Sequence, residues 1–222
     1  MRVEWFGQSA FSLTAPEATV FVDPFGDMSA AAARGLRWDY PPIEGVACDL
    51  LLVTHEHPDH NRVEAIDGDP SVLRSTAGRL ESPIGEVLAV ASEHDAAAGT
   101  ERGPNTIFVF DLGDLRVAHF GDLGQAALRD EQAAAIGTVD LAFVPVGGGP
   151  TIDGEQAAAI ATTIGARWVV PMHYRTPRID FLLEAGDFLE RMPGVHRVGA
   201  NHFDTDDLPA DGGPLVVVPD AP

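Results

Sequence analysis

The run Thr54-His55-Glu56-His57-Pro58-Asp59-His60 concentrates metal-binding chemistry in a short segment. It holds three of the chain's eight histidines, a density that chance spacing explains poorly. Imidazole nitrogens and carboxylate oxygens are ligands that Zn²⁺ and similar transition-metal ions take in proteins. Pro58 argues against a helical H-E-x-x-H site, which needs two histidines four residues apart on one helix face. The run therefore predicts a metal site on a loop, with a polar surface loop as the alternative.

The elements that must position this loop are short and varied. Residues 49–54 form an apolar run without helical period, which predicts a buried strand directly before the motif. Further strands are predicted at 3–6, 11–13, 19–22, 87–92, 106–112, 115–120, 140–146, 168–171 and 215–218. Helices are predicted within 28–40 and at 61–66, 125–136, 154–164 and 181–192. No linker-like stretch divides the chain, so we predict one layered α/β domain over residues 1–222.

Charge and composition disfavour several classes of protein. The chain has 222 residues with 34 acidic and 14 basic side chains, a net charge of −20, and every basic residue is arginine. Because so acidic a surface repels phosphate backbones and anionic membranes, we expect no nucleic-acid or membrane partner. The single cysteine, Cys48, excludes an intramolecular disulfide, and no apolar run approaches the ~20 residues of a membrane helix. The N-terminus lacks a basic region followed by an apolar stretch, so we expect a cytoplasmic protein.

Four later segments follow the motif in a recognisable order: Ser92-Glu93-His94-Asp95, His119-Phe120-Gly121-Asp122-Leu123-Gly124, Pro145-Val146-Gly147-Gly148 and Pro171-Met172-His173-Tyr174. Together with H-x-H-x-D-H after an apolar strand, they resemble the metallo-β-lactamase superfamily. Within it, they are similar to the small single-domain hydrolases that include ascorbate-6-phosphate lactonase-like proteins. The resemblance runs from Gly7-Gln8-Ser9 and Asp23-Pro24 to His173. It implies an α/β fold, the four-layer αββα sandwich of the metallo-β-lactamase type.

The resemblance also implies the metal ligands. Seven side chains are involved: His55, His57 and His94 for a first ion, Asp59, His60 and His173 for a second, and Asp122 as a bridge between them. Several imidazoles with few carboxylates suit Zn²⁺, Mn²⁺ or Fe²⁺ better than Ca²⁺ or Mg²⁺. We therefore expect two divalent transition-metal ions, with Zn²⁺ as the first choice. For the later residues of this set, the alternatives are a surface histidine or an aspartate that stabilises a turn.

Some residues outside this set could support the site. His119 lies on the strand before Asp122, so we expect it to have a structural or ligand-supporting role. Asp23 ends an apolar segment and either orients a histidine or caps a turn. Arg175 and Arg178 either meet a substrate anion or lie in a solvated loop.

The expected activity is hydrolysis at a dinuclear site. Two cations lower the pKa of a shared water toward ~7, which supplies hydroxide at neutral pH, and they polarise the carbonyl or phosphoryl group under attack. Asp59 is the predicted catalytic residue, because its carboxylate can hold this hydroxide as well as ligate. We expect a small-molecule ester, lactone, thioester or phosphodiester, which could be anionic, and the chain could form a homo-oligomer. The alternative is a non-catalytic scaffold or partner-binding protein of the same fold, against which the complete set of seven candidate ligands argues.

Overall fold

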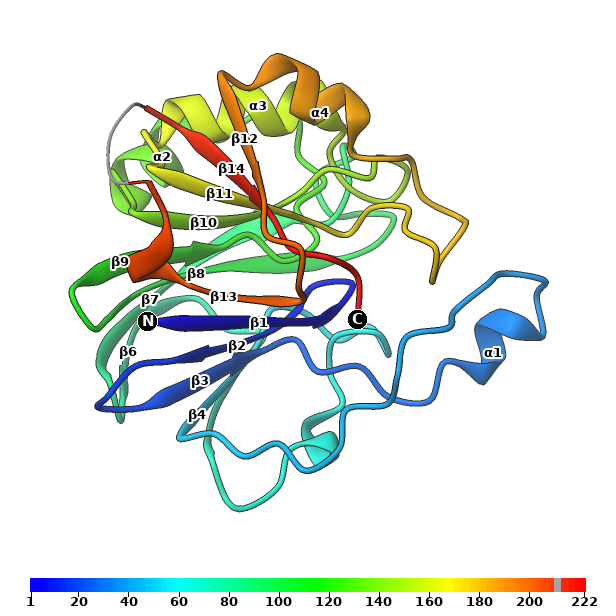
Figure 1. Ribbon diagram of the computed structural model, residues 1–222, viewed down its shortest axis with the longest axis horizontal. Helices are drawn as coiled ribbons and strands as arrows, with labels where there is room; N and C mark the ends of the chain where they lie inside the picture. The colour runs from blue at the N-terminus through cyan, green and yellow to red at the C-terminus, as the bar shows by residue number, and fades with distance from the viewer. Residues whose placement is uncertain (210–212) are drawn as a thin grey trace.

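Two β-sheets form the frame of the protein (Figure 1). The computed structural model describes residues 1–209 and 213–222. The first sheet contains β1 (Arg2–Gly7), β2 (Ala10–Thr14), β3 (Thr19–Val22), β4 (Leu50–Val53), β5 (Ser71–Arg74) and β13 (His202–Asp204). The second contains β6 (Gly78–Ser82), β7 (Gly85–Glu93), β8 (Pro104–Leu112), β9 (Leu115–His119), β10 (Leu141–Pro145), β11 (Trp168–Met172), β12 (Gly194–Arg197) and β14 (Leu215–Val218). The strand orders are β13-β1-β2-β3-β4-β5 and β12-β14-β11-β10-β9-β8-β7-β6.

The main core lies between the two sheets. Phe11 of β2 and Phe143 of β10 meet across this interface with ring centroids 4.5 Å apart. In β1, alternate residues such as Val3 and Trp5 point into the core, as expected for a strand with one buried face. Every residue of β10 and β11 is buried, because these parallel strands are covered on both faces.

Helices cover the outer face of the second sheet. They are α2 (Asp130–Ile136), α3 (Gly154–Thr163) and α4 (Gly186–Arg191), which lie together on one side of the molecule (Figure 1). Asp153 caps α3 by accepting a hydrogen bond from the Gln156 backbone N–H at 3.0 Å. Ile136, Ala157 and Phe188 are the buried contacts of these helices with the core. Within the described residues, no helix combines the length and apolar character needed to cross a lipid bilayer.

The outer face of the first sheet has a different cover. Phe21 and Leu51 of this sheet pack in a second apolar cluster with loop residues that include Phe25, Tyr40 and Ile179. The helix α1 is only Ser29–Ala32 and projects from the body in Figure 1. The helix predicted at 61–66 is a single 3₁₀ turn, η1 (Val63–Ala65). The predicted α/β sandwich is therefore confirmed, while loops form most of its layer over the first sheet.

Two predicted helices are shorter than expected, and tertiary contacts of the backbone account for one of them. The segment predicted at 181–192 is helical only as α4, since the Leu183 N–H donates to the Gly147 carbonyl and its own carbonyl accepts from Arg175. The segment predicted at 125–136 is helical only as α2, from Asp130 onward. Four strands lie outside the sequence prediction, namely β5, β6, β12 and β13, and each is the edge strand of its sheet.

Candidate metal centre

The seven candidate ligands follow the carboxyl ends of four strands. The loop from His55 to His60 follows β4 of the first sheet, whereas His94, Asp122 and His173 follow β7, β9 and β11 of the second. The site therefore lies at one rim of the sandwich, where loops from both sheets converge on a rigid frame. All seven residues come together there, and their role as ligands stays a prediction.

Their ligating atoms form two groups. His55, His57 and His94 form the first cluster, and Asp59, His60, Asp122 and His173 form the second, with the ligating atoms of each within 4.8 Å of one another. This division matches the assignment implied by the sequence resemblance, with Asp122 grouped with the second cluster.

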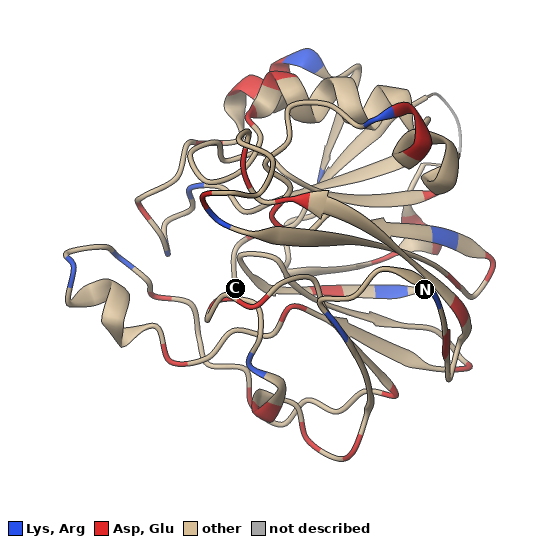
Figure 2. Ribbon diagram, turned by 180° about the vertical axis from the view of Figure 1, so that it is seen from behind, with Lys and Arg blue, Asp and Glu red and all other residues tan. Residues whose placement is uncertain are grey.

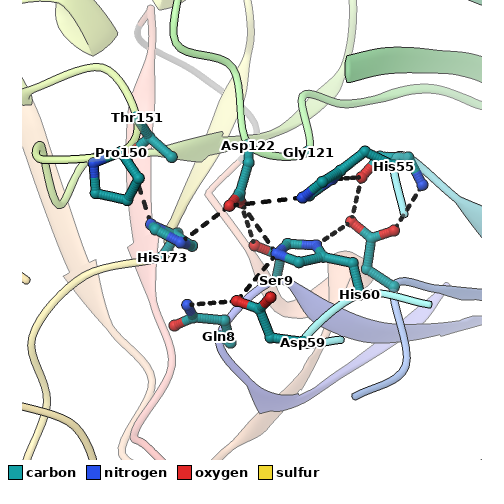
Figure 3. A network of polar contacts seen from close by, with 12 residues as sticks. Gln8, Ser9, His55, Asp59, His60, Gly121, Asp122, Pro150, Thr151 and His173 are labelled. Carbon is teal, nitrogen blue, oxygen red and sulfur yellow. Dashed lines mark hydrogen bonds and ion pairs between the residues drawn. The ribbon is translucent and has the colours of Figure 1, made fainter. Parts of the chain in front are cut away.

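Asp122 contacts both clusters (Figure 3). Its Oδ2 lies 3.3 Å from Nε2 of His94 and 3.1 Å from Nε2 of His173, and its Oδ1 lies 3.3 Å from Nε2 of His60. Ligand atoms bound at ~2.0–2.1 Å to a tetrahedral Zn²⁺ are separated from one another by about 3.3 Å. The spacing around Asp122 is therefore compatible with a ligand set.

Four of the imidazoles are oriented through their Nδ1 atoms. The contacts are His60 to Asp23 Oδ2 at 2.9 Å, His55 to Thr54 Oγ1 at 3.0 Å, His94 to the Pro150 carbonyl at 3.1 Å and His173 to Thr151 Oγ1 at 3.5 Å. An Nδ1 atom that donates outward leaves Nε2 with a free lone pair, which is the arrangement typical of metal-binding histidines. All four Nε2 atoms are thus available to a cation.

Asp23 organises two of these rings at once. Its carboxylate accepts hydrogen bonds from the Thr54 N–H at 2.8 Å, the Thr54 hydroxyl at 2.7 Å and His60. Because the Thr54 hydroxyl donates to Asp23, its oxygen must accept from His55 Nδ1–H. Asp23 holds a left-handed backbone conformation with φ 53°, an unusual state for a residue other than glycine. The prediction that Asp23 orients a histidine is confirmed.

Two buried nitrogens of the site lack a hydrogen-bond partner among the described residues, namely Nε2 of His55 and Nε2 of His60. A buried polar atom left unpaired costs about 1–3 kcal/mol, so such atoms call for a missing partner. A transition-metal ion would accept both lone pairs. The residues present therefore fit the metal ions that the sequence implies.

The electrostatics of the site separate two histidines. Burial, reinforced by the nearby charge of His60, lowers the pKa of His55 to about 2, so its ring is neutral and ready to ligate. Burial also acts to lower the pKa of His60, but Asp122, Asp59 and Asp23 together outweigh it and raise the pKa well above the usual value.

Asp59 is the carboxylate of the site that meets solvent. Its side chain is 20% exposed, against 3% for Asp122. His60 lies 3.5 Å away and, despite the opposing effect of burial, holds the pKa of Asp59 below its usual range. Asp59 therefore stays ionised at a partly exposed edge of the second cluster.

Gln8 and Ser9 are site residues to which the sequence assigned no chemical role. Gln8 Nε2 lies 3.5 Å from Asp59 Oδ2, and Ser9 Oγ lies 3.4 Å from Asp122 Oδ1. The Gln8 side chain is fully buried, its Oε1 has no hydrogen-bond partner among the described residues, and its φ is 51°. The segment Gly7-Gln8-Ser9 belongs to the family resemblance, and this is the sequence signal that could have indicated them.

The remaining candidates have structural contacts. His119 Nε2 donates to the Ser9 carbonyl at 3.0 Å, and its Nδ1 accepts from the Gly121 N–H, which agrees with the supporting role predicted for it. Arg175 donates to the carbonyls of Leu182 and Asp180. Arg178 donates to the Pro222 carbonyl at 2.6 Å. Both guanidinium groups thus bond to backbone carbonyls of loops, and a contact of either with a substrate anion stays a prediction.

Sequence comparison identifies the family. The sequence model of the β-lactamase superfamily domain matches residues 2–173, a span that includes all seven candidate ligands. The chain belongs to the metallo-β-lactamase superfamily. A superfamily relative, a UPF0173 protein of Pyrococcus abyssi, is 30% identical over 199 residues, which cover 79% of this chain and 84% of the relative. A UPF0173 metal-dependent hydrolase of Methanosphaera stadtmanae is 27% identical over 208 residues, covering 79% and 85%.

A solved superfamily structure agrees with this assignment. A Thermotoga maritima protein, assigned as a Zn-dependent hydrolase of the metallo-β-lactamase superfamily, superposes with a TM-score of 0.77 at 29% identity. The superposition covers 98% of both chains. The present chain is thus a metal-dependent hydrolase of the superfamily.

Proposed function

We propose that this hydrolase uses a dinuclear transition-metal site to cleave a small-molecule ester, lactone, thioester or phosphodiester. The observation that carries the proposal is the orientation of four imidazoles. Each has its Nδ1 engaged outside the site, and their Nε2 atoms surround the Asp122 carboxylate. A scaffold that only needed the fold would not require four rings fixed in the ligating orientation.

In this proposal His55, His57 and His94 would hold one ion, Asp59, His60 and His173 would hold the other, and Asp122 would be shared between them. Two such ions, most simply Zn²⁺, supply a water of lowered pKa and polarise the group under attack. Asp122 suits the bridging position because its two oxygens already contact histidines of both clusters. His60 suits the second ion because Asp23 fixes its tautomer.

Asp59 is the residue to which we assign nucleophile positioning. Its carboxylate is ionised and partly exposed, and Gln8 and His60 each lie 3.5 Å from its Oδ2. A carboxylate in this position accepts a hydrogen bond from the attacking water and fixes the direction of attack. An Asn side chain has the same size but lacks the charge.

We place the enzyme in the cytoplasm with a small-molecule substrate and no nucleic-acid partner. The support is the single cysteine and the net charge of −20. Lactones belong to the substrate range because of the resemblance to ascorbate-6-phosphate lactonase-like proteins.

The test is turnover of lactone, ester, thioester and phosphodiester substrates by metal-loaded protein, with and without a chelator. Asp59→Asn should lower kcat by roughly 10², about 3 kcal/mol in the transition state, and leave the melting temperature near that of wild type. Asp39→Asn is the matched control, because Asp39 is an exposed aspartate whose nearest ion pair is with Arg37. Full turnover by Asp59→Asn would refute the assigned role.

The alternative is a metal-binding scaffold. It would be preferred if the metal-loaded wild type hydrolysed no substrate of the panel while its metal content matched the ligand set.

A further inference from the structure

A cavity of about 210 Å³ lies beside the first cluster. Two of the candidate ligands, His55 and His57, form part of its wall, so a molecule bound in the cavity would lie against the first cluster. Arg102, Ser75 and Thr106 line the cavity as well. Seven of its eight lining residues have a polar or charged side chain and the eighth is Pro104, so the cavity offers hydrogen-bond partners to a polar ligand.

The acidic residue of this lining is already neutralised. Glu56 accepts hydrogen bonds from Arg74 Nε at 2.9 Å, Ser75 Oγ at 2.7 Å and Asn61 Nδ2 at 3.2 Å. Glu56 therefore does not serve as the counter-ion of Arg102.

Arg102 differs from most arginines of the chain. Eight others form ion pairs with carboxylates, Arg175 and Arg178 bind backbone carbonyls, and Arg167 packs over the Trp168 ring. The side chains of Arg34, Arg102 and Arg197 have no hydrogen-bond or ion-pair partner within residues 1–209 and 213–222. Of these three, Arg102 is the one that lines the cavity beside the candidate ligands. In Figure 2 acidic positions are spread over the molecule and arginines are few, so a free cation beside the site is unusual.

The backbone around Arg102 is fixed with respect to the first cluster. Asp95 accepts hydrogen bonds from four backbone N–H groups of its own loop, including that of Arg102 at 2.8 Å. The next residue, Gly103, accepts a hydrogen bond from the His94 N–H at 3.1 Å. The carboxylate of Asp95 is thus engaged by backbone N–H groups, and the backbone at Arg102 is joined to that of His94 through Gly103.

We propose that Arg102 is a specificity-determining residue that binds an anionic group, a carboxylate or a phosphate, of the substrate. The guanidinium fork matches both groups, and a chain with a net charge of −20 needs a local cation to attract an anion. The proposal rests on the proposed function, because it assigns the substrate's charged group to the cavity while the scissile bond lies at the metal clusters. Substrates are then acyl or phosphoryl compounds with a second, non-reacting anionic group.

The test is ligand binding to the zinc-loaded protein by calorimetry at low ionic strength. The probes are succinate, glutarate and adipate, each compared with its monomethyl ester, which retains one carboxylate for the metals and lacks the second charge. Wild type should bind one of the dianions about tenfold more tightly than its ester, the worth of one charge-assisted hydrogen bond. Arg102→Gln should reduce this preference to less than about twofold while the ester's affinity stays unchanged.

Arg34→Gln is the control, since Arg34 is exposed beside α1 and its loss changes the net charge by the same amount. A parallel titration with 4-phosphonobutyrate distinguishes a carboxylate from a phosphate as the anion that Arg102 binds. The anionic group of the probe that loses more affinity in Arg102→Gln is the one that Arg102 binds. A dianion preference that persists in Arg102→Gln, or one that vanishes equally in Arg34→Gln, would overturn the proposal.

This assay separates the two proposals because it needs no turnover. An Arg102-dependent preference in a protein that hydrolyses nothing would keep the anion site and refute the hydrolytic role. Turnover that depends on Asp59, with no Arg102-dependent preference for a dianion, would support the hydrolytic role and overturn the proposed anion site.

Discussion

Nδ1 of His60 lies 2.9 Å from Oδ2 of Asp23, and both side chains are fully buried. Asp23 comes from the end of β3, whereas His60 belongs to the loop after β4. The pair therefore ties the motif loop to the neighbouring strand. Because Asp23 also accepts from the N–H and hydroxyl of Thr54, one carboxylate fixes the loop's entry and the tautomer of a candidate ligand.

Asp23→Asn should weaken metal binding by about 10–100-fold, as is typical when the partner of a metal-binding histidine is changed. The Asn amide would place its donor NH₂ against either Thr54, where the contact with the loop's entry is lost, or Nδ1 of His60, where it favours the other His60 tautomer and removes the free Nε2 lone pair. The measurement is metal competition against a chromophoric chelator. Asp111→Asn, at an exposed aspartate of β8, is the control. Unchanged metal affinity in Asp23→Asn would show that the contact does not control the ligand.

Asp122→Ala should bind at least one ion fewer than wild type, which should bind close to two per chain. The reason is that the Asp122 carboxylate contacts histidines of both clusters. The measurement is metal content of the purified proteins after equilibration with excess Zn²⁺ and desalting. A wild type that bound one ion and was fully active would contradict the dinuclear proposal.

Gln8→Leu should lower the affinity for one ion by about tenfold, because Asp59 loses the amide beside its Oδ2. The metal-free protein should stay as stable as wild type, since the substitution also removes the unpartnered Oε1. Metal isotherms and melting curves of both forms check this. Gln132→Leu should instead leave the metal affinity unchanged and lower the stability of the protein, because Gln132 forms hydrogen bonds with Gln125 and the Ala91 carbonyl on the α2 side. Equal metal affinity in Gln8→Leu and wild type would rule out the positioning role.

Gly147→Ala should destabilise the protein by about 1–3 kcal/mol, the usual range for overpacking. A Cβ at Gly147 would lie 2.1 Å from the His173 carbonyl oxygen and 2.8 Å from Tyr174 Cα, both of which are backbone atoms. Chemical denaturation of the metal-free protein measures the effect. Gly186→Ala is the control, because a Cβ there meets no atom within 4 Å. Equal stability of the two variants would mean that the His173 backbone yields without strain.

No measurable binding to duplex DNA or structured RNA is expected at physiological salt. A net charge of −20 opposes the phosphate contacts on which such binding depends. Fluorescence anisotropy with labelled duplexes tests the expectation. Sub-micromolar binding that weakens with salt would favour a nuclease instead.

The sequence determined the strands that carry the core. Buried strands such as β4 and β10 are apolar throughout, and their residues read as strands without tertiary information. The four edge strands could not be predicted from the sequence, because each has half-exposed residues and no apolar run. In β5 and β12, for example, intermediate and exposed positions alternate. Their pairing depends on a neighbouring strand that already exists.

The sequence also determined the chemistry of the site. The residue types and spacing from His55 to His60 were enough to predict a transition-metal site, and the family resemblance implied the partners downstream. These are local features, because ligand chemistry is a property of the side chains themselves.

Only the tertiary structure decided how those side chains act together. The pairing of His60 with Asp23, of His94 with the Pro150 carbonyl and of Ser9 with Asp122 joins residues 37, 56 and 113 positions apart. Such contacts leave no local pattern, because they arise where separate strands end at the same rim. Likewise, Arg102 and Arg175 are both loop arginines in the sequence. The structure distinguishes them, because folding satisfies the Arg175 guanidinium with backbone carbonyls, whereas the Arg102 guanidinium beside the candidate ligands has no partner among the described residues.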